Sequence, residues 1–217
     1  MAMQPITLTS GMRANLVSLQ NTNSLLELTQ KRLASGKKVN SALDDPVAYF
    51  TAVAHEQRAS DLAARKDDMS ESIQMVKAAD SGIQTINTLI AAARSLANSA
   101  MSAESTAAVA TLADQFDIVR SQIDRVAADS GYKGVNLLDS DEYIVTFDED
   151  GDSTLTLTGF DASTDGDITI SAAAGTWDPA DTSIQDSIDE LTAATTTLRT
   201  ESSALANNLS IITARQE

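Results

Sequence analysis

The sequence feature that most limits the fold is a very long stretch without helix breakers. Between Val47 and Ala100 there is no proline and only one glycine, Gly82. The preceding Asp44-Asp45-Pro46 predicts a helix start, because an aspartate caps free backbone N–H groups and proline suits the first helical turn. About fifty helical residues at 1.5 Å each would extend for roughly 80 Å. A compact domain of this size does not need such a helix, so the sequence predicts a protein built on long helices.

Apolar residues recur at alternating steps of three and four along this stretch and along two later segments. A break at Ser102–Ser105 separates the long helix from a second helix that begins near Thr106, and the last helix runs from Ile184 to Ile212. The spacing puts the apolar side chains on one face of each helix, which predicts that the three helices pack together. The predicted bundle core consists of Ile73, Val76, Ile83, Ile90, Leu112, Phe116, Val119, Ile123, Val126, Ile188, Leu191, Leu198, Leu205 and Leu209.

The N-terminal segment carries a similar apolar stripe, but the chain offers it no partner. We expect its helix to end at Ala34-Ser35-Gly36, because glycine accepts the left-handed conformation that commonly closes a helix. Since the other helices can cover one another, the stripe is interpreted as an assembly surface. Its members are Met12, Leu16, Leu19, Leu26 and Leu33.

Negative charge is concentrated in the second half of the chain. Residues 134–198 contain fifteen acidic residues and neither Lys nor Arg. Such a segment repels phosphate groups and anionic lipids, so we expect no nucleic-acid partner and no membrane partner. Within it, residues 143–147, 155–157 and 168–170 alternate apolar and polar side chains between Asp- and Gly-rich turns, which predicts short hairpin strands.

The expected fold class is therefore mainly α, an elongated antiparallel bundle of long helices with a small β-rich distal insert. The predicted domain organisation has four parts: an N-terminal assembly helix and loop in residues 1–43, a long helical hairpin in 44–138, a small acidic β-rich variable domain in 139–180 and a return helix in 181–217.

The residue inventory argues against an enzyme. There is no cysteine and only one histidine, His55, so neither a thiol nucleophile nor a His-based triad or metal site can be built. Residues 161–168 match the first eight positions of a calcium loop, but Ala172 stands where that loop needs a glutamate. An Asp-Gly turn is the preferred interpretation and weak calcium binding by Asp161 to Asp167 is the alternative. We expect no cofactor.

The chain shows no targeting or membrane segment. Met1–Gln20 lacks the basic start, the apolar core and the small-residue cleavage site of a secretory signal peptide. No stretch approaches the roughly 18 apolar residues that a membrane-spanning helix requires.

Three segments carry a resemblance to a known family. The run from Leu33 to Pro46, reading Leu-Ala-Ser-Gly-Lys-Lys-Val-Asn-Ser-Ala-Leu-Asp-Asp-Pro, is similar to a conserved-looking stretch of the bacterial flagellins. Gly131–Leu138, reading Gly-Tyr-Lys-Gly-Val-Asn-Leu-Leu, resembles a second flagellin signature, and Asn208–Glu217 resembles the flagellin return helix. The motifs occur in the family order and on the expected helix and loop contexts.

The resemblance implies a structural subunit that polymerises with other flagellin subunits into the extracellular filament used for motility. It further implies export without a cleaved signal peptide, an export chaperone before secretion, and contacts with the filament cap and junction proteins. In this family the terminal helices form the inner tube of the filament, and the middle helices form the surrounding shell.

The chain departs from the family pattern at its C-terminus. Flagellins continue beyond the position of Glu217 into another apolar helix, so we expect a truncated chain that does not form a normal filament alone. A hook-filament junction protein is the main alternative, because such proteins share both helical ends. A secreted hydrolase with its site in the β-rich insert is a third, weak alternative, because that insert contains no histidine and no basic residue.

Overall fold

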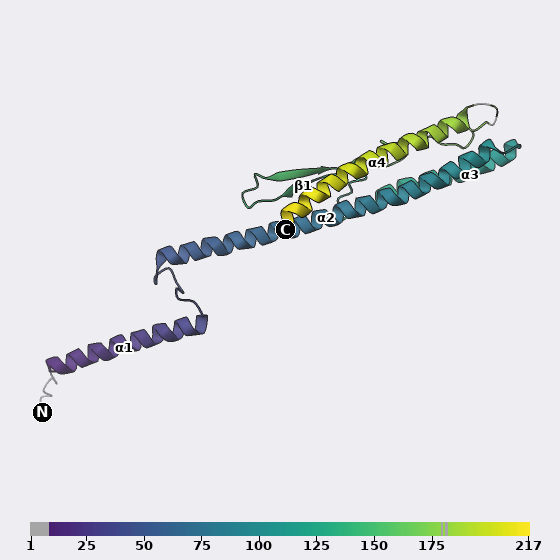
Figure 1. The fold of residues 1–217 in the computed structure, drawn as a ribbon. Coiled ribbons are helices and arrows are strands. Elements are labelled where there is room, and N and C mark those ends of the chain that lie inside the picture. Colours follow the sequence, from purple (N-terminus) through teal and green to yellow (C-terminus); the bar gives the residue numbers. More distant parts are fainter. Residues whose placement is uncertain (1–8, 179, 181) are drawn as a thin grey trace. The chain divides into compact units, whose positions relative to one another are not determined.

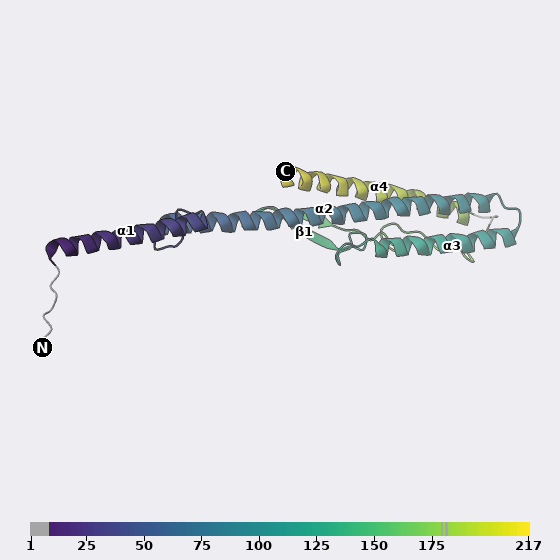
Figure 2. The same cartoon turned by 90° about the horizontal axis from the view of Figure 1, so that it is seen from below.

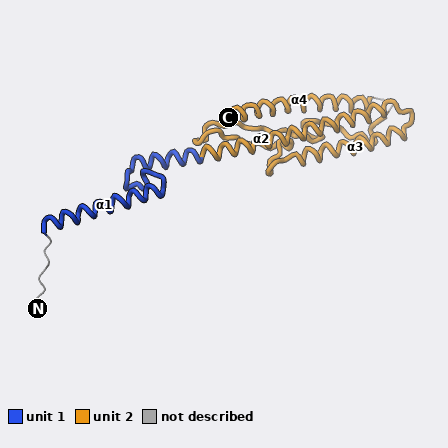
Figure 3. Tube along the Cα trace, turned by 60° about the horizontal axis from the view of Figure 1, so that its bottom comes forward, with its two compact units in different colours: residues 1–60 blue, residues 61–217 orange. Residues whose placement is uncertain are grey.

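The structure is a computed structural model that describes residues 9–178, 180 and 182–217. The first eight residues, on which part of the signal-peptide expectation rests, lie outside the described part. The chain divides into two compact units, Met1–Ser60 (unit 1) and Asp61–Glu217 (unit 2), drawn in different colours in Figure 3. This division lies within the long helix, whereas the sequence placed its first boundary between residues 43 and 44. Each unit is described by itself.

Unit 1 contains helix α1, a loop and the first turns of helix α2. Helix α1 spans Ser10–Ser35 and is closed by Gly36, whose φ of 68° is the left-handed conformation that glycine adopts without strain. The predicted end of this helix is confirmed. Helix α2 spans Pro46–Met101, as Asp44-Asp45-Pro46 indicated, and is 56 residues long. None of the described residues of unit 1 is buried.

Unit 2 is an antiparallel bundle in which α2 packs against two shorter helices. Helix α3 spans Thr106–Asp129 and helix α4 spans Ser183–Gln216, both close to their predicted bounds. Contacts between α2 and α4 step in opposite directions along the two helices, because Arg94 meets Thr192 while Ser70 meets Gln216. Helices α3 and α4 therefore run in the same direction, each antiparallel to α2 (Figures 1 and 2).

The close approach of α2 to the end of α3 depends on Gly82. A Cβ atom at this position would lie 2.6 Å from Leu138 Cδ1 and closer still to Ser130 Oγ. Ser130 Oγ is itself held in place, since it donates a hydrogen bond to the Val126 carbonyl at 2.6 Å. The only glycine between Val47 and Ala100 therefore marks a packing contact.

The Gly131–Leu138 segment closes α3 and begins the next layer. Asn136 is only 8% exposed, and its Nδ2 donates to the carbonyls of Ala127 and Ala128 at 2.7 and 3.1 Å. Its Oδ1 accepts the Leu138 N–H at 3.0 Å. The amide thus bonds to two carbonyls in the last turn of α3, where a helix runs out of its own N–H donors; the Ala127 carbonyl also accepts the Ser130 N–H at 3.4 Å. Leu137 and Leu138 are each 1% exposed, so the motif is a helix cap followed by a core anchor.

A two-stranded antiparallel sheet follows, formed by β1 (Glu142–Thr146) and β2 (Thr154–Thr158). Tyr143 pairs with Leu157 and Val145 with Leu155 in the register. These two strands were predicted from the alternation of apolar and polar residues. The hairpin also contacts the last turn of α4, because the Arg215 guanidinium lies 4.5 Å from the centre of the Phe147 ring.

The prediction of a strand at residues 168–170 was wrong. Ile168 and Ile170 are each 1% exposed, but this part of the described chain forms a turn and irregular backbone. Its backbone groups have other partners: Ile170 N–H donates to the Thr164 carbonyl at 2.9 Å, and Arg120 Nε donates to the Ile170 carbonyl at 2.7 Å. Since these partners satisfy the backbone, the two isoleucines are buried without a neighbouring strand.

Residues 161–178, here called the strap, run along α3 and are hydrogen-bonded to three of its side chains. Thr164 N–H donates to Asp124 at 2.8 Å, and Arg120 donates to the Ile170 carbonyl. Asp117 accepts two strap N–H groups at 2.8 and 2.9 Å. This role could not be predicted from the sequence, because charged residues on a helix face usually point into solvent.

The other side of the strap contacts α4 and the bundle core. Ser171 N–H donates to Glu190 at 2.7 Å. The Trp177 ring packs 4.9 Å from the Phe116 ring, centre to centre, and its Nε1 donates to Ser187 Oγ at 2.9 Å. The strap is therefore bonded to both α3 and α4, and it leads the chain to the start of α4.

We expect Gly82→Ala to destabilise unit 2. Alanine gains about 1 kcal/mol of helix propensity over glycine, but overpacking against Ser130 and Leu138 costs about 1 to 3 kcal/mol. The control is Gly11→Ala in α1, where an added Cβ meets nothing within 4 Å. The free energy of unfolding in urea checks both variants, and a Gly82→Ala protein more stable than the parent would contradict this account of the helix contact.

We also expect Asn136→Ala to lower the free energy of unfolding by about 1 to 3 kcal/mol, because buried hydrogen-bonding groups lose their partner. Asn136→Asp keeps an acceptor for Leu138 but cannot donate to the α3 carbonyls, and its charge is unfavourable at a helix C-terminus. It should be at least as damaging as alanine. The exposed Asn98→Ala serves as the control, with an expected change within about 0.5 kcal/mol.

Candidate assembly surface

The predicted assembly stripe lies on α1 and is uncovered. Its five side chains all face solvent within unit 1, and the least exposed is Leu16 at 49% while the most exposed is Leu33 at 83%. The stripe members are Met12, Leu16, Leu19, Leu26 and Leu33; this set is called the α1 stripe below. Removing such side chains from water is favourable by about 1.5 to 3 kcal/mol each, so a covered stripe would be strongly stabilised.

The opposite face of α1 is the one that unit 1 partly covers. Leu28 and Arg32 are the partly buried side chains of this helix. At about 100° per residue, Leu28 lies about 160° around the helix from Met12. Val17 and Leu25, which lie away from the stripe, are also 53% and 67% exposed, so unit 1 leaves most of the α1 surface open and covers only the part around Leu28 and Arg32.

A second uncovered apolar group lies on the first turns of α2 and was missed in the sequence. Val47, Phe50 and Val53 are 78%, 62% and 43% exposed, and they are called the α2 cluster below. Tyr49 packs edge-on against Phe50, with ring centres 5.6 Å apart. The three-residue spacing of Val47, Phe50 and Val53 indicates that they share one face of the helix. Such a face is normally interpreted as part of a core, so the spacing alone does not predict its exposure.

The loop between the two helices is fixed by side-chain caps. Asp44 Oδ2 accepts the N–H groups of Asn40 and Ser41 at 3.0 and 3.2 Å. Asp45 Oδ1 accepts the Ala48 N–H at 3.1 Å, which caps the start of α2. The run that carries the family resemblance therefore encodes a helix stop, an Asp-capped loop and a helix start.

The charge of Asp44 is part of this loop. The hydrogen bond from the Asn40 N–H, supported by the one from Ser41, holds the pKa of the Asp44 carboxyl below its ordinary value of 3.8. A carboxyl whose pKa is lowered in the folded state stabilises that state above its unfolded pKa, and the contribution is lost as the pH falls through the lowered value. The loop is therefore expected to be intact at neutral pH.

We expect the amide protons of Asn40 and Ser41 to lose protection from hydrogen exchange when acid protonates Asp44. The loss should occur below pH 3.8, since the folded-state pKa lies below that value. Asp44→Asn should show weak protection at these two amides already at neutral pH. Asp45→Asn should leave them protected, because Asp45 caps α2 instead; equal losses in both variants would contradict the assignment.

The residues predicted for the bundle core lie in unit 2, on the facing sides of α2, α3 and α4. Eight are buried: Val76, Ile83, Ile90, Phe116, Ile123, Leu191, Leu198 and Leu205. The other six are partly buried and pack against that core: Ile73, Leu112, Val119, Val126, Ile188 and Leu209.

The acidic residues of the possible calcium loop bond to other groups of the protein. In the strap, Asp161 Oδ1 accepts the Ser163 N–H at 2.9 Å, while Asp165 pairs with Arg120 at 2.5 Å. The carboxylates of the calcium-loop match thus bond to backbone and to a cation. Among the described residues, no group of three or more His, Cys, Asp or Glu is placed to hold a metal ion. His55 is exposed on α2.

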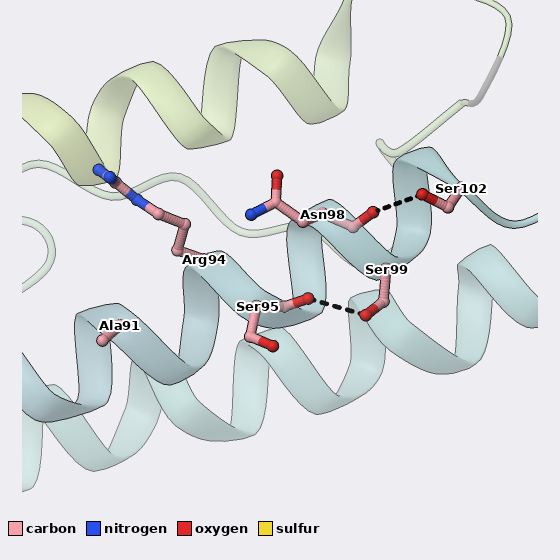
Figure 4. A pocket seen from close by; sticks show the side chains of 6 residues that line it. All are labelled: Ala91, Arg94, Ser95, Asn98, Ser99 and Ser102. Carbon is pink, nitrogen blue, oxygen red and sulfur yellow. Dashed lines mark hydrogen bonds between the residues drawn. The ribbon is translucent and has the colours of Figure 1, made fainter.

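A shallow groove on α2, shown in Figure 4, is lined by polar and small residues. Two of its hydroxyls bond to the α2 backbone, because Ser99 Oγ donates to the Ser95 carbonyl at 2.8 Å and Ser102 Oγ to the Asn98 carbonyl at 3.1 Å. Arg94 reaches across to Thr192 on α4 at 2.7 Å. No helix in the described part of the chain is both long and apolar enough to cross a membrane.

Comparisons with known proteins identify the family. The model of the bacterial flagellin N-terminal helical region matches residues 7–142. Flagellin FljO of Caulobacter vibrioides is 29% identical over 222 residues, which cover 98% of this chain and 80% of FljO. Flagellin FljK of the same organism is 29% identical over 201 residues, covering 88% of this chain and 74% of FljK.

A solved structure shares the fold. The crystal structure of Bacillus cereus flagellin aligns with a TM-score of 0.60 at 16% sequence identity, covering 70% of this chain and 87% of that protein. The family match spans α1, α2, α3 and the Asn136 cap, which are the elements whose local chemistry is described above. The chain therefore belongs to the bacterial flagellin family, the family of subunits that build the flagellar filament.

Proposed function

We propose that this chain joins the flagellar filament through unit 1, with the α1 stripe as its main contact surface. The observation that carries the proposal is the contrast between the units. Unit 2 buries most of its large apolar side chains in one core, whereas no described residue of unit 1 is buried and most of its large apolar side chains face solvent. An uncovered apolar face of this extent is typical of an interaction site.

The proposed roles of the segments follow from this contrast. Unit 2, closed by the bundle, the hairpin and the strap, serves as the rigid shell of the subunit. Helix α1 serves as the inner-tube segment, where neighbouring subunits cover its stripe. The predicted variable domain, which contains the acidic hairpin and the strap, forms the part that faces away from the assembly contacts, because its charges are best kept in solvent.

The partners before assembly are proposed on the same grounds. A subunit with an uncovered apolar stripe needs protection from self-association, which supports binding to an export chaperone in the cell. Membership of the family supports the proposal of export to the flagellum without a cleaved signal peptide, and of contacts with the cap and junction proteins. The family match and the named relatives favour a filament subunit, and nothing among them favours a junction protein.

The test is incorporation of the purified chain into filament seeds, measured by pelleting and electron microscopy. We expect the parent chain to pellet with the seeds and Leu16→Glu to reduce incorporation by tenfold or more. Burying Leu16 is favourable by about 1.5 to 3 kcal/mol, and a buried unpaired carboxylate adds a further cost. Each 1.4 kcal/mol corresponds to about tenfold in affinity.

Val17→Glu is the matched control. Val17 is 53% exposed in the same helix, but it lies about 140° around the helix from Met12. This variant should incorporate close to the parent level, and circular dichroism should show that both variants keep their helices. Equal losses in the two variants would mean that the stripe has no special role, and failure of the parent chain to join seeds would count against the proposed function.

A further inference from the structure

The hairpin formed by β1 and β2 has two outer strand edges, because its sheet is two-stranded. The Phe147 N–H donates to the Ser153 carbonyl and the Gly159 N–H donates to the Asp141 carbonyl, both at 2.9 Å. In an antiparallel ladder every second opposed pair is joined by hydrogen bonds, so the bonded pairs of β2 include its two leucines. The N–H and C=O groups that point outward from β2 belong to Thr154, Thr156 and Thr158.

These outward groups of β2 are free within unit 2. No described residue donates a hydrogen bond to their carbonyls or accepts one from their N–H groups, and the three threonine side chains are exposed. Edge strands are usually protected from pairing by a charged residue, a proline or a bulge within the strand. The sequence of β2, Thr-Leu-Thr-Leu-Thr, contains neither charge nor proline. Its outer edge is therefore a template on which another strand can pair.

The outer edge of β1 is less suited to this. Its outward groups belong to Glu142, Ile144 and Thr146, and the Thr146 side chain is half-buried. A new strand beside β1 would lie next to a charged and a half-buried residue. Beside β2 it would lie next to three exposed β-branched residues, which favour an extended neighbour.

Unpaired carboxylates stand at both ends of β2, whereas the strand itself is uncharged. Asp150 and Asp152 precede it, and Glu142 lies opposite its last residue, Thr158. All three carboxylates are exposed, and no described residue bonds to them. An antiparallel pair of two β2 strands would bring Asp150 and Asp152 of one copy against Glu142 of the other, so pairing with a second copy is disfavoured. A strand with basic ends is attracted at both ends.

We propose that the outer edge of β2 binds an extended peptide segment of a partner protein, with β-branched residues at its centre and Lys or Arg at both ends. The segment adds a third strand to the hairpin. Main-chain hydrogen bonds to the three threonines supply the affinity, and the carboxylates at the ends of β2 select a basic partner. This contact uses neither the α1 stripe nor the α2 cluster, so it does not rest on the proposed function.

The first test measures binding of a fluorescent peptide reading Lys-Lys-Val-Thr-Val-Thr-Val-Lys-Lys to the full chain by anisotropy. Thr156→Pro removes the central outward N–H of β2 without removing a hydrogen bond to β1, and should weaken binding by about tenfold or more. Ile144→Pro makes the same change on β1 and is the matched control, with affinity expected within about twofold of the parent. If Thr156→Pro binds like the parent chain, or if both variants lose affinity equally, the inference is overturned.

The second test changes the peptide and keeps the parent chain. Exchanging the lysines for glutamates should abolish binding, because the carboxylates around β2 then repel both ends of the peptide. Placing proline at two adjacent central positions keeps the charge but removes one N–H that faces β2 in either register, and should weaken binding by about tenfold or more. A proline peptide that binds as well as the original would show attraction to the acidic surface alone and would overturn the proposed strand pairing.

Amide hydrogen exchange on the parent chain then locates the occupied edge. With saturating peptide, the N–H groups of Thr154, Thr156 and Thr158 should gain about tenfold or more protection, because they point outward and acquire partners. The N–H groups of Leu155 and Leu157 already bond to β1, so their exchange should change little. Protection gained at Ile144 and Thr146 instead would place the peptide on β1 and overturn the inference.

Discussion

The structure of unit 2 depends on covering the apolar face of α2 from Met69 onward. Two helices cover it, and both run antiparallel to α2. Consecutive helices with the same direction need a connection as long as the helix itself, and α3, with 24 residues, extends for about 36 Å. The hairpin and the strap are that connection. Asp117, Arg120 and Asp124 are the side chains of α3 that hold the returning chain along the helix.

The helices could be predicted because their signal is local and repeated. Periodic apolar residues, Gly36 and Asp44-Asp45-Pro46 act within a few turns of one another, so their effect does not depend on distant partners. The strand expected at residues 168–170 failed for the opposite reason. The alternation of apolar residues predicts that Ile168 and Ile170 are buried. Only the tertiary structure shows that the backbone of Ile170 bonds to Arg120 and Thr164.

The exposure of the candidate assembly surface also depends on tertiary structure and could be predicted only in part. The spacing of Met12, Leu16 and Leu19 predicts an apolar face, but an apolar face is buried or exposed according to what packs on it. The α1 stripe was predicted to be exposed because the other predicted helices can cover one another. Phe50 was not predicted to be exposed, because its neighbours resemble the start of an ordinary core. Its exposure became evident only when the buried residues of α2 proved to begin at Met69.

The acidic charge of the chain is divided unequally between the two units. Unit 1 has six basic and four acidic residues, so the whole acidic excess of a chain with net charge −16 lies in unit 2. Two copies of unit 2 repel each other over a distance of about 8 Å at physiological salt. Contacts between copies through unit 2 must therefore offset this repulsion with specific pairs, whereas the uncovered apolar side chains of unit 1 meet no such opposing charge.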